Sequence, residues 1–182
     1  GGYYSGLNSA TDSYILFSAG GMDFIILCLE YNPTTAELNW ANSIFQQYSN
    51  RRAIFVTHCL LNTDGSWAED VQSVYNALKG NSNLFLMLCG HMHTVNVGTT
   101  VPENEAIRTE TYSGHTIYIV LANYQCVAPN EQGNGPWGGG IIRIMTFTPS
   151  ANQIHFQTYQ LLPTIHYYTD SKSDFVLTYN MN

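Results

Sequence analysis

The sequence predicts an α/β (α+β) fold, in which a β-α-β-α-β segment precedes mostly antiparallel strands. The first half of the chain alternates short, continuous apolar runs with stretches of helical periodicity. Continuous apolar runs are typical of strands that are covered on both faces. After His93 the helical periodicity disappears, and apolar segments separated by turn residues follow. With 182 residues, 45% of them hydrophobic, the chain can bury a sizeable core.

Three apolar runs predict central, parallel strands. They span residues 24–29, 53–57 and 84–89. A helix is expected between the first two runs, because Thr34 and Glu37 have the spacing of a capping box and apolar residues follow at helical intervals. Ser66 and Glu69 repeat the spacing and predict a second helix, which Gly80 would close. The order favours right-handed crossovers between parallel strands.

Five later segments are expected to be strands of a mostly antiparallel sheet layered on the first part. They span residues 105–111, 116–121, 140–147, 153–160 and 174–179. Residues 128–140 are rich in Gly, Pro and Asn, and their length favours a functional or lid-like loop. No domain boundary is visible, so residues 1–182 are expected to form a single unit.

Charge and hydropathy each exclude one class of partner. The formal net charge is −7, only 10% of residues are charged, and the four arginines are scattered, so we expect no nucleic-acid surface. No run approaches the ~18 apolar residues that a membrane span needs.

The neutral polar composition favours an extracellular or periplasmic protein. None of the cysteines has C-x-x-C spacing, and we expect all of them to be free thiols; they are Cys28, Cys59, Cys89 and Cys126.

Three histidines are expected at one rim of the parallel sheet. His58 follows the second apolar run, and His91 and His93 follow the third. Ligands bind beyond the carboxyl ends of parallel strands, and imidazole is the commonest metal ligand in proteins. Gly90 lets the backbone turn sharply out of the strand. The spacing therefore leaves two interpretations of these histidines: they bind a metal ion, or they form only ordinary hydrogen bonds.

Two sequence blocks at these histidines point to a family. Thr57-His58-Cys59-Leu60 and Cys89-Gly90-His91-Met92-His93 resemble the lone-histidine and G-H-x-H signatures of the calcineurin-like metallophosphoesterases. The resemblance implies a four-layer αββα sandwich and two divalent or trivalent metal ions of the Mn, Fe or Zn class. His58 and His91 would bind one ion and His93 the other. Such a centre activates water and hydrolyses a phosphate ester.

The first three signatures of that family, D-x-H, G-D-x-x-D and G-N-H-D/E, are absent from these residues. The chain is therefore expected to be the C-terminal portion of a metallophosphoesterase domain. It would need an N-terminal part, or a subunit that covers its exposed sheets, for activity. Alone, three imidazoles would bind at most one ion weakly, and we expect the isolated chain to be inactive.

Two alternatives stay open. The chain could be a catalytically inactive structural or binding module that retains the fold, or a mononuclear hydrolase in which three histidines bind one zinc ion. Asn123 and Tyr124 follow a predicted strand and are candidates for substrate binding, although polar residues at strand ends more often form turns.

Overall fold

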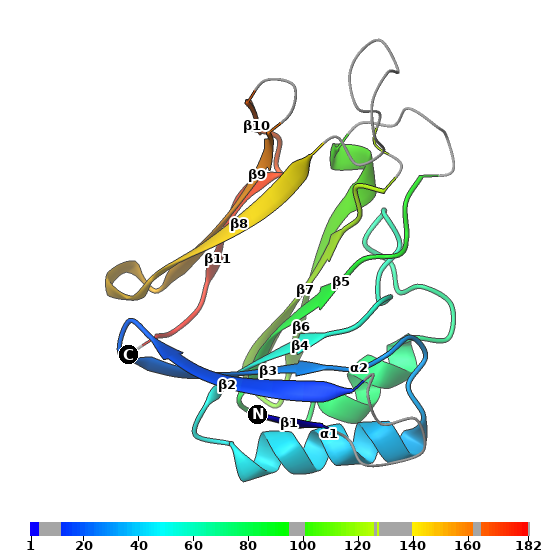
Figure 1. Ribbon diagram of the computed structural model, residues 1–182, viewed down its shortest axis with the longest axis vertical. Coiled ribbons are helices and arrows are strands. Elements are labelled where there is room, and N and C mark those ends of the chain that lie inside the picture. Colours follow the sequence, from blue (N-terminus) through cyan, green and yellow to red (C-terminus); the bar gives the residue numbers. More distant parts are fainter. Residues whose placement is uncertain (4–11, 95–100, 126, 128–139, 162–164, 182) are drawn as a thin grey trace. The chain divides into compact units, whose positions relative to one another are not determined.

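The computed structural model describes residues 1–3, 12–94, 101–125, 127, 140–161 and 165–181 (Figure 1). The chain divides into two compact units. The first comprises Gly1–His91 and Ile107–Leu121, and the second comprises Met92–Ala106 and Ala122–Asn182. That residues 1–182 form one portion of a single metallophosphoesterase domain stays a prediction.

The first unit is built on a seven-stranded sheet with the order β1-β2-β3-β4-β5-β7-β6, whose last strands extend into the second unit. Its strands are β1 (Gly2–Tyr3), β2 (Ser13–Ala19), β3 (Met22–Cys28), β4 (Arg52–Val56), β5 (Leu84–Cys89), β6 (Glu105–Tyr112) and β7 (His115–Ala122). β3, β4 and β5 are parallel neighbours, which confirms the three central strands.

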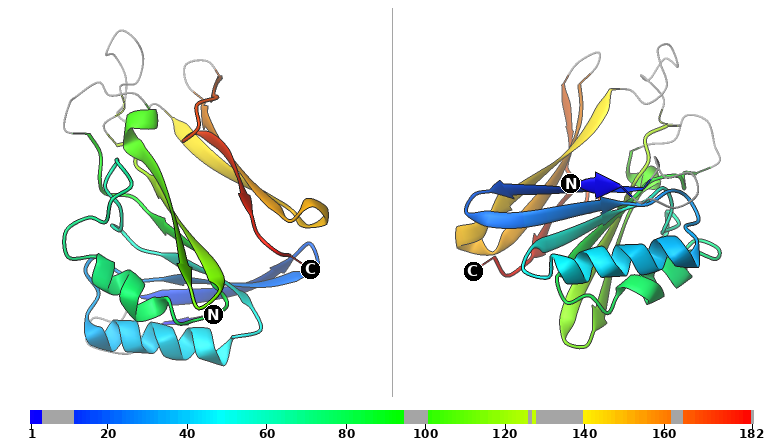
Figure 2. Two further views of the ribbon diagram at one scale, coloured as in Figure 1. Left: turned by 180° about the vertical axis from the view of Figure 1, so that it is seen from behind. Right: turned by 60° about the horizontal axis from the view of Figure 1, so that its bottom comes forward.

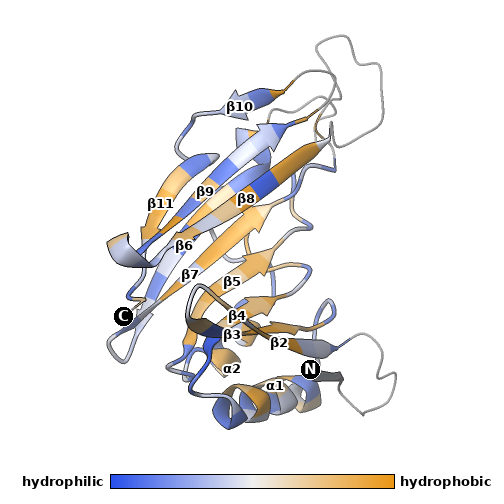
Figure 3. Cartoon of the chain, turned by 60° about the vertical axis from the view of Figure 1, so that its left-hand side comes forward, coloured by the Kyte–Doolittle hydropathy of each residue, from blue (hydrophilic) through white to orange (hydrophobic). Residues whose placement is uncertain are grey.

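β7 also pairs parallel with β5, although the second half was expected to be mostly antiparallel. The reason is burial. Ile117, Ile119 and Leu121 are fully buried, and Figure 3 shows both β5 and β7 as almost continuously hydrophobic strands. A strand that is covered on both faces suits the interior of a parallel sheet.

Helix α1 (Thr35–Gln47) begins at the predicted capping box, in which Thr34 and Glu37 satisfy each other's backbone N–H groups. Helix α2 (Gln72–Leu78) follows between β4 and β5. Both helices lie on the same face of the sheet (Figure 2), as right-handed crossovers between successive parallel strands require. The Asn42 side chain on α1 donates to the Ala77 carbonyl on α2 at 3.1 Å, which holds the helices together.

The predicted second capping box is wrong. The N–H and hydroxyl of Ser66 both donate to the Asp64 carboxylate, at 2.8 and 2.6 Å, within a turn. An antiparallel bridge between Leu61 and Trp67 keeps this segment extended. The helix therefore begins later, after Val71, without a side-chain cap.

The second unit contains a four-stranded antiparallel sheet, as predicted for this part of the chain. Its strands are β8 (Ile141–Thr148), β9 (Gln153–Gln160), β10 (His166–Tyr168) and β11 (Asp174–Thr178). β8 pairs with one edge of β9, while β10 and β11 pair in succession with the other. Short 3-10 helices lie at η1 (Pro102–Asn104) and η2 (Pro149–Ala151). The whole chain thus has a mixed α+β fold.

β8 alternates as predicted, but its aliphatic residues face outward. Ile142 and Ile144 are exposed, whereas Arg143 is nearly buried. The side chain of Arg143 turns inward because Glu105 lies there and pairs with it.

Some predictions fall wholly or partly outside the described residues, namely those on Cys126 and on most of the 128–140 loop. Cys28, Cys59 and Cys89 are free thiols. Within the described part of the chain, no helix is long and apolar enough to cross a membrane.

Candidate metal centre

Strands β4 and β5 bring two histidines together in the first unit. β4 ends at Val56 and β5 at Cys89, and the pairing continues beyond them because the Gly90 N–H donates to the His58 carbonyl at 3.0 Å. His58 Nε2 lies 2.9 Å from His91 Nδ1, and the ring centroids are 4.6 Å apart. Both side chains are exposed. We define these two residues as the histidine pair.

The backbone of His91 is strained. Its φ is 63°, a left-handed conformation that residues other than glycine rarely adopt. Such a conformation costs about 1–3 kcal/mol and persists where the surrounding structure enforces it, often at functional sites. Here the turn after Gly90 aims the His91 ring at His58.

The end of a third strand, β3, places an aromatic side chain next to the histidine pair. Tyr31 follows β3, and its ring centroid lies 5.6 Å from each ring of the histidine pair. The Thr57 hydroxyl donates to the Glu30 carbonyl at 3.0 Å and ties the end of β4 to the segment that carries Tyr31. The sequence analysis did not identify Tyr31 as a site residue. Its signal was its place at the end of the first apolar run.

The thiols next to the histidine pair are not available as thiolates. Burial raises the pKa of the Cys89 thiol to about 12 and also raises the pKa of Cys59. Thiolate is the form of cysteine that binds metal. At neutral pH the donors of the first unit's candidate site are therefore imidazole nitrogens.

His93 belongs to the second unit, where its Nδ1 lies 2.8 Å from the Thr94 carbonyl oxygen. A carbonyl cannot donate, so Nδ1 is the donor. In the described ranges, no group of three or more His, Cys, Asp or Glu side chains lies close enough to hold a metal ion. The histidine pair therefore offers two nitrogen ligands to a metal ion.

Asn123 and Tyr124 lie in the second unit at the end of β7. The Asn123 side chain accepts from the Gln125 N–H at 3.0 Å and forms a turn. The Tyr124 hydroxyl donates to Glu105 at 2.5 Å, and burial raises the pKa of that hydroxyl. Both polar groups thus have partners within the protein.

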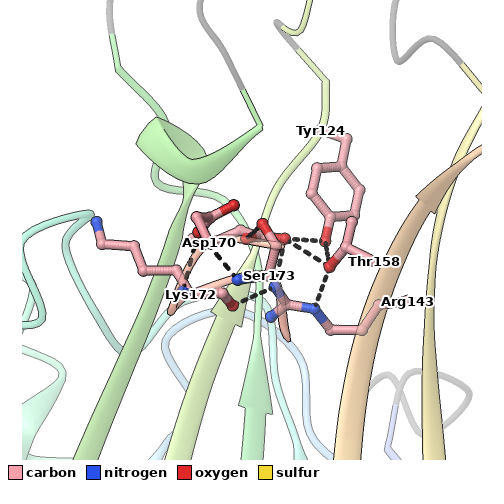
Figure 4. Close-up of polar contacts among 7 residues, drawn as sticks. Tyr124, Arg143, Thr158, Asp170, Lys172 and Ser173 are labelled. Carbon is pink, nitrogen blue, oxygen red and sulfur yellow. Dashed lines mark hydrogen bonds and ion pairs between the residues drawn. The ribbon is translucent and has the colours of Figure 1, made fainter. Parts of the chain in front are cut away.

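A buried ionic cluster, which we call the Glu105 network, lies in the second unit (Figure 4). The fully buried Glu105 carboxylate pairs with Arg143 and accepts hydrogen bonds from three hydroxyl groups. These belong to Ser173 at 2.6 Å, Thr158 at 3.0 Å and Tyr124 at 2.5 Å. No sequence signal joined these residues, because their contacts link segments up to 68 positions apart.

A second polar cluster lies on the more exposed face of the β9 sheet. Asp174 accepts from Tyr167 and pairs with His155, and these two contacts hold the pKa of the Asp174 carboxyl below its usual range. Gln157 donates to the Tyr167 hydroxyl at 3.1 Å. His155 is thus a hydrogen-bonded histidine.

No protein-family model matches the chain. It is similar to the uncharacterized protein YvnB of Bacillus subtilis (strain 168), with 26% identity over 148 residues. The matched region covers 80% of this chain but 11% of YvnB. The chain therefore spans about a tenth of the length of this relative.

Proposed function

We propose that this chain supplies His58, His91 and His93 to the two-metal centre of a calcineurin-like metallophosphoesterase that hydrolyses a phosphate ester. The remaining ligands would come from an N-terminal part of the domain outside these residues. The observation that carries the proposal is the histidine pair, formed by the two sequence blocks that resemble the family signatures. We also propose an extracellular or periplasmic location, from the neutral polar composition.

The geometry of the histidine pair fits a metal ion. Two nitrogens bound to one metal ion at ~2.0–2.1 Å, at angles of roughly 90–109°, stand about 2.8–3.4 Å apart. His58 Nε2 and His91 Nδ1 are 2.9 Å apart. An ion would take the place of the proton that now lies between them.

When bound, two divalent ions supply Lewis acidity that activates water and neutralises charge on the phosphoryl group. The residues of this chain would hold that centre. The strained turn at His91 and the Gly90 to His58 hydrogen bond fix both rings at one sheet edge. The ring of Tyr31 lies 5.6 Å, between centroids, from each of these rings. Pre-set ligands of this kind lose little conformational freedom when the ion binds.

We also propose how this chain fits into the fold of the complete domain. The mixed sheet, whose central strands are parallel and which has α1 and α2 on one face, would be part of a four-layer αββα sandwich. The missing helices and strands would come from the N-terminal part.

The test is metal content and p-nitrophenyl phosphate hydrolysis, measured on this chain and on the gene's full product. We expect two ions and activity in the full product, and at most one weakly bound ion without activity in the chain alone. His91→Ala should remove the activity and at least one ion. His166→Ala is the matched control, because His166 is exposed on β10 and should affect neither. A full product that binds no metal would refute the proposal.

One observation favours the alternative of an inactive binding module. One face of the antiparallel sheet exposes Ile142, Ile144 and Val176, at 40%, 43% and 48% of their surface. Apolar residues gathered on one exposed face suit contact with another protein surface. A full product that assembles with a partner yet binds no metal would support this alternative. One tightly bound ion that survives neither His58→Ala nor His93→Ala would instead support the mononuclear hydrolase.

A further inference from the structure

A single buried amide holds the segment that follows the G-H-x-H block. Asn104, the last residue of η1, has no exposed surface. Its Oδ1 accepts from the Thr94 N–H at 3.0 Å and from the Thr94 hydroxyl at 3.3 Å. All these residues belong to the second unit. The side chain of Asn104 therefore fixes the peptide plane next to His93.

Asn104 is itself fixed on several sides. Its N–H donates to the Val101 carbonyl at 3.0 Å, and its carbonyl accepts from the Asn123 N–H at 3.1 Å. The next residue is Glu105, whose carboxylate is locked into the Glu105 network. Because backbone and neighbour are both anchored, the Asn104 amide cannot turn away without breaking buried hydrogen bonds.

The Thr94 carbonyl determines which nitrogen of His93 carries the proton, and Asn104 holds Thr94 by its N–H and its hydroxyl. The His93 Nδ1–H donates to the Thr94 carbonyl at 2.8 Å. In the neutral ring, the lone pair then belongs to Nε2. A histidine that binds a metal usually donates its other ring N–H to a carbonyl or carboxylate, which sets both the tautomer and the ring orientation.

We infer that Asn104 is a positioning residue, which acts through Thr94 on His93 and makes His93 Nε2 the nitrogen that binds metal. The inference rests on the proposed function for the identity of the ligand. The hydrogen-bond chain from Asn104 to His93 does not depend on it. Loss of the group to which a metal-binding histidine donates typically weakens metal binding by about 10–100-fold, and Asn104 acts on that group, the Thr94 carbonyl, from one residue further out.

The first test reads the tautomer without any metal. Long-range ¹H–¹⁵N spectra of the metal-free chain labelled with ¹⁵N-histidine, at a pH of about 8 where an ordinary imidazole is neutral, separate the two tautomers. His93→Gln assigns the signal. We expect the Nδ1–H form in the wild type and a mixture in Asn104→Ala. A wild-type ring in the Nε2–H form would overturn the inference, even if no variant folds.

The second test is a double-mutant cycle on Zn²⁺ affinity in the full product. Asn104→Ala should weaken Zn²⁺ binding by more than about twofold and by at most about 10–100-fold, which is the cost of losing a direct partner of the histidine. In the His93→Ala background the same change should have less than about a twofold effect, because the side chain through which it acts is gone. Asn81→Ala is the matched control, since Asn81 is also buried but precedes β5 at the end away from His91.

The outcomes separate the two proposals. An equal loss of Zn²⁺ affinity in both backgrounds, or no loss in either, would overturn the role of Asn104 and leave the phosphoesterase proposal intact. A full product that binds no Zn²⁺, but whose His93 tautomer depends on Asn104, would overturn the proposed function and support the coupling of Asn104 to His93.

Discussion

Arg143→Met should destabilise the second unit more than any change on its surface. The substitution keeps the apolar length of the side chain but removes the only described cation that pairs with Glu105, whose side chain is 0% exposed. Breaking a buried ion pair on one side costs about 3–5 kcal/mol. A folded domain has a total stability of about 5–15 kcal/mol, so the loss is a large share of it.

The hydroxyl groups of the Glu105 network should matter less individually. Ser173→Ala removes a 2.6 Å hydrogen bond to the carboxylate, and a hydrogen bond to a charged group contributes about 1.5–3 kcal/mol. Thr158 and Tyr124 would still donate to Glu105 in that variant. The order of stability loss should therefore be Arg143→Met first and Ser173→Ala second.

Urea denaturation followed by circular dichroism measures these differences. Arg108→Met is the control. Its ion pair with Glu110 is partly exposed and should contribute about 1 kcal/mol or less, and its other contacts are with the Gly65 carbonyl and the Trp67 ring, not with a buried carboxylate. The double variant Glu105→Leu with Arg143→Met should recover part of the loss, since no unpaired charge stays buried. If Arg143→Met destabilises the protein no more than Arg108→Met does, the Glu105 network is not the ionic anchor described above.

Three further predictions concern single groups. Tyr167 and His155 lower the pKa of the Asp174 carboxyl in the folded protein. The ionised Asp174 therefore stabilises the fold above pH 3.8, and this contribution disappears as the pH falls through the folded pKa. The urea midpoints of the wild type and of Asp174→Asn should differ at pH 7 and converge in acid. The Cys89 thiol, with its pKa raised to about 12, should resist iodoacetamide at pH 8 until urea unfolds the chain, as peptide mass mapping would reveal. Thr34→Ala should lower the stability by about 1 kcal/mol through loss of the α1 capping box, whereas an unchanged thermal midpoint would contradict that role.

Local patterns predicted the parts of the fold that local forces determine. The continuous apolar runs located β3, β4 and β5, and the capping box at Thr34 located the start of α1. The equivalent spacing at Ser66 failed, because the Asp64 carboxylate competes for the same N–H and hydroxyl. β10 was missed because three residues are too few to show a period.

In the candidate site, too, some residues could be predicted from the sequence and others could not. The strand ends placed His58 and His91 at one sheet edge, since adjacent parallel strands end together. Asn104 and Glu105 carried no such signal. Their roles depend on side chains brought together by the fold, and an isolated Asn-Glu pair in a sequence does not indicate burial.

The parallel pairing of β4 with β5 has a consequence for how the protein folds. Ile54 pairs with Leu86, 32 positions away, whereas Thr148 pairs with Gln153 across the short turn between β8 and β9. Closing a long loop costs more chain entropy, so hairpins of the second kind form within microseconds and parallel pairs form late. The histidine pair exists only when β4 and β5 are in register. Metal uptake at the proposed centre during refolding would therefore report a late step of assembly, and an ion could select the paired strands but not guide the chain toward that pairing.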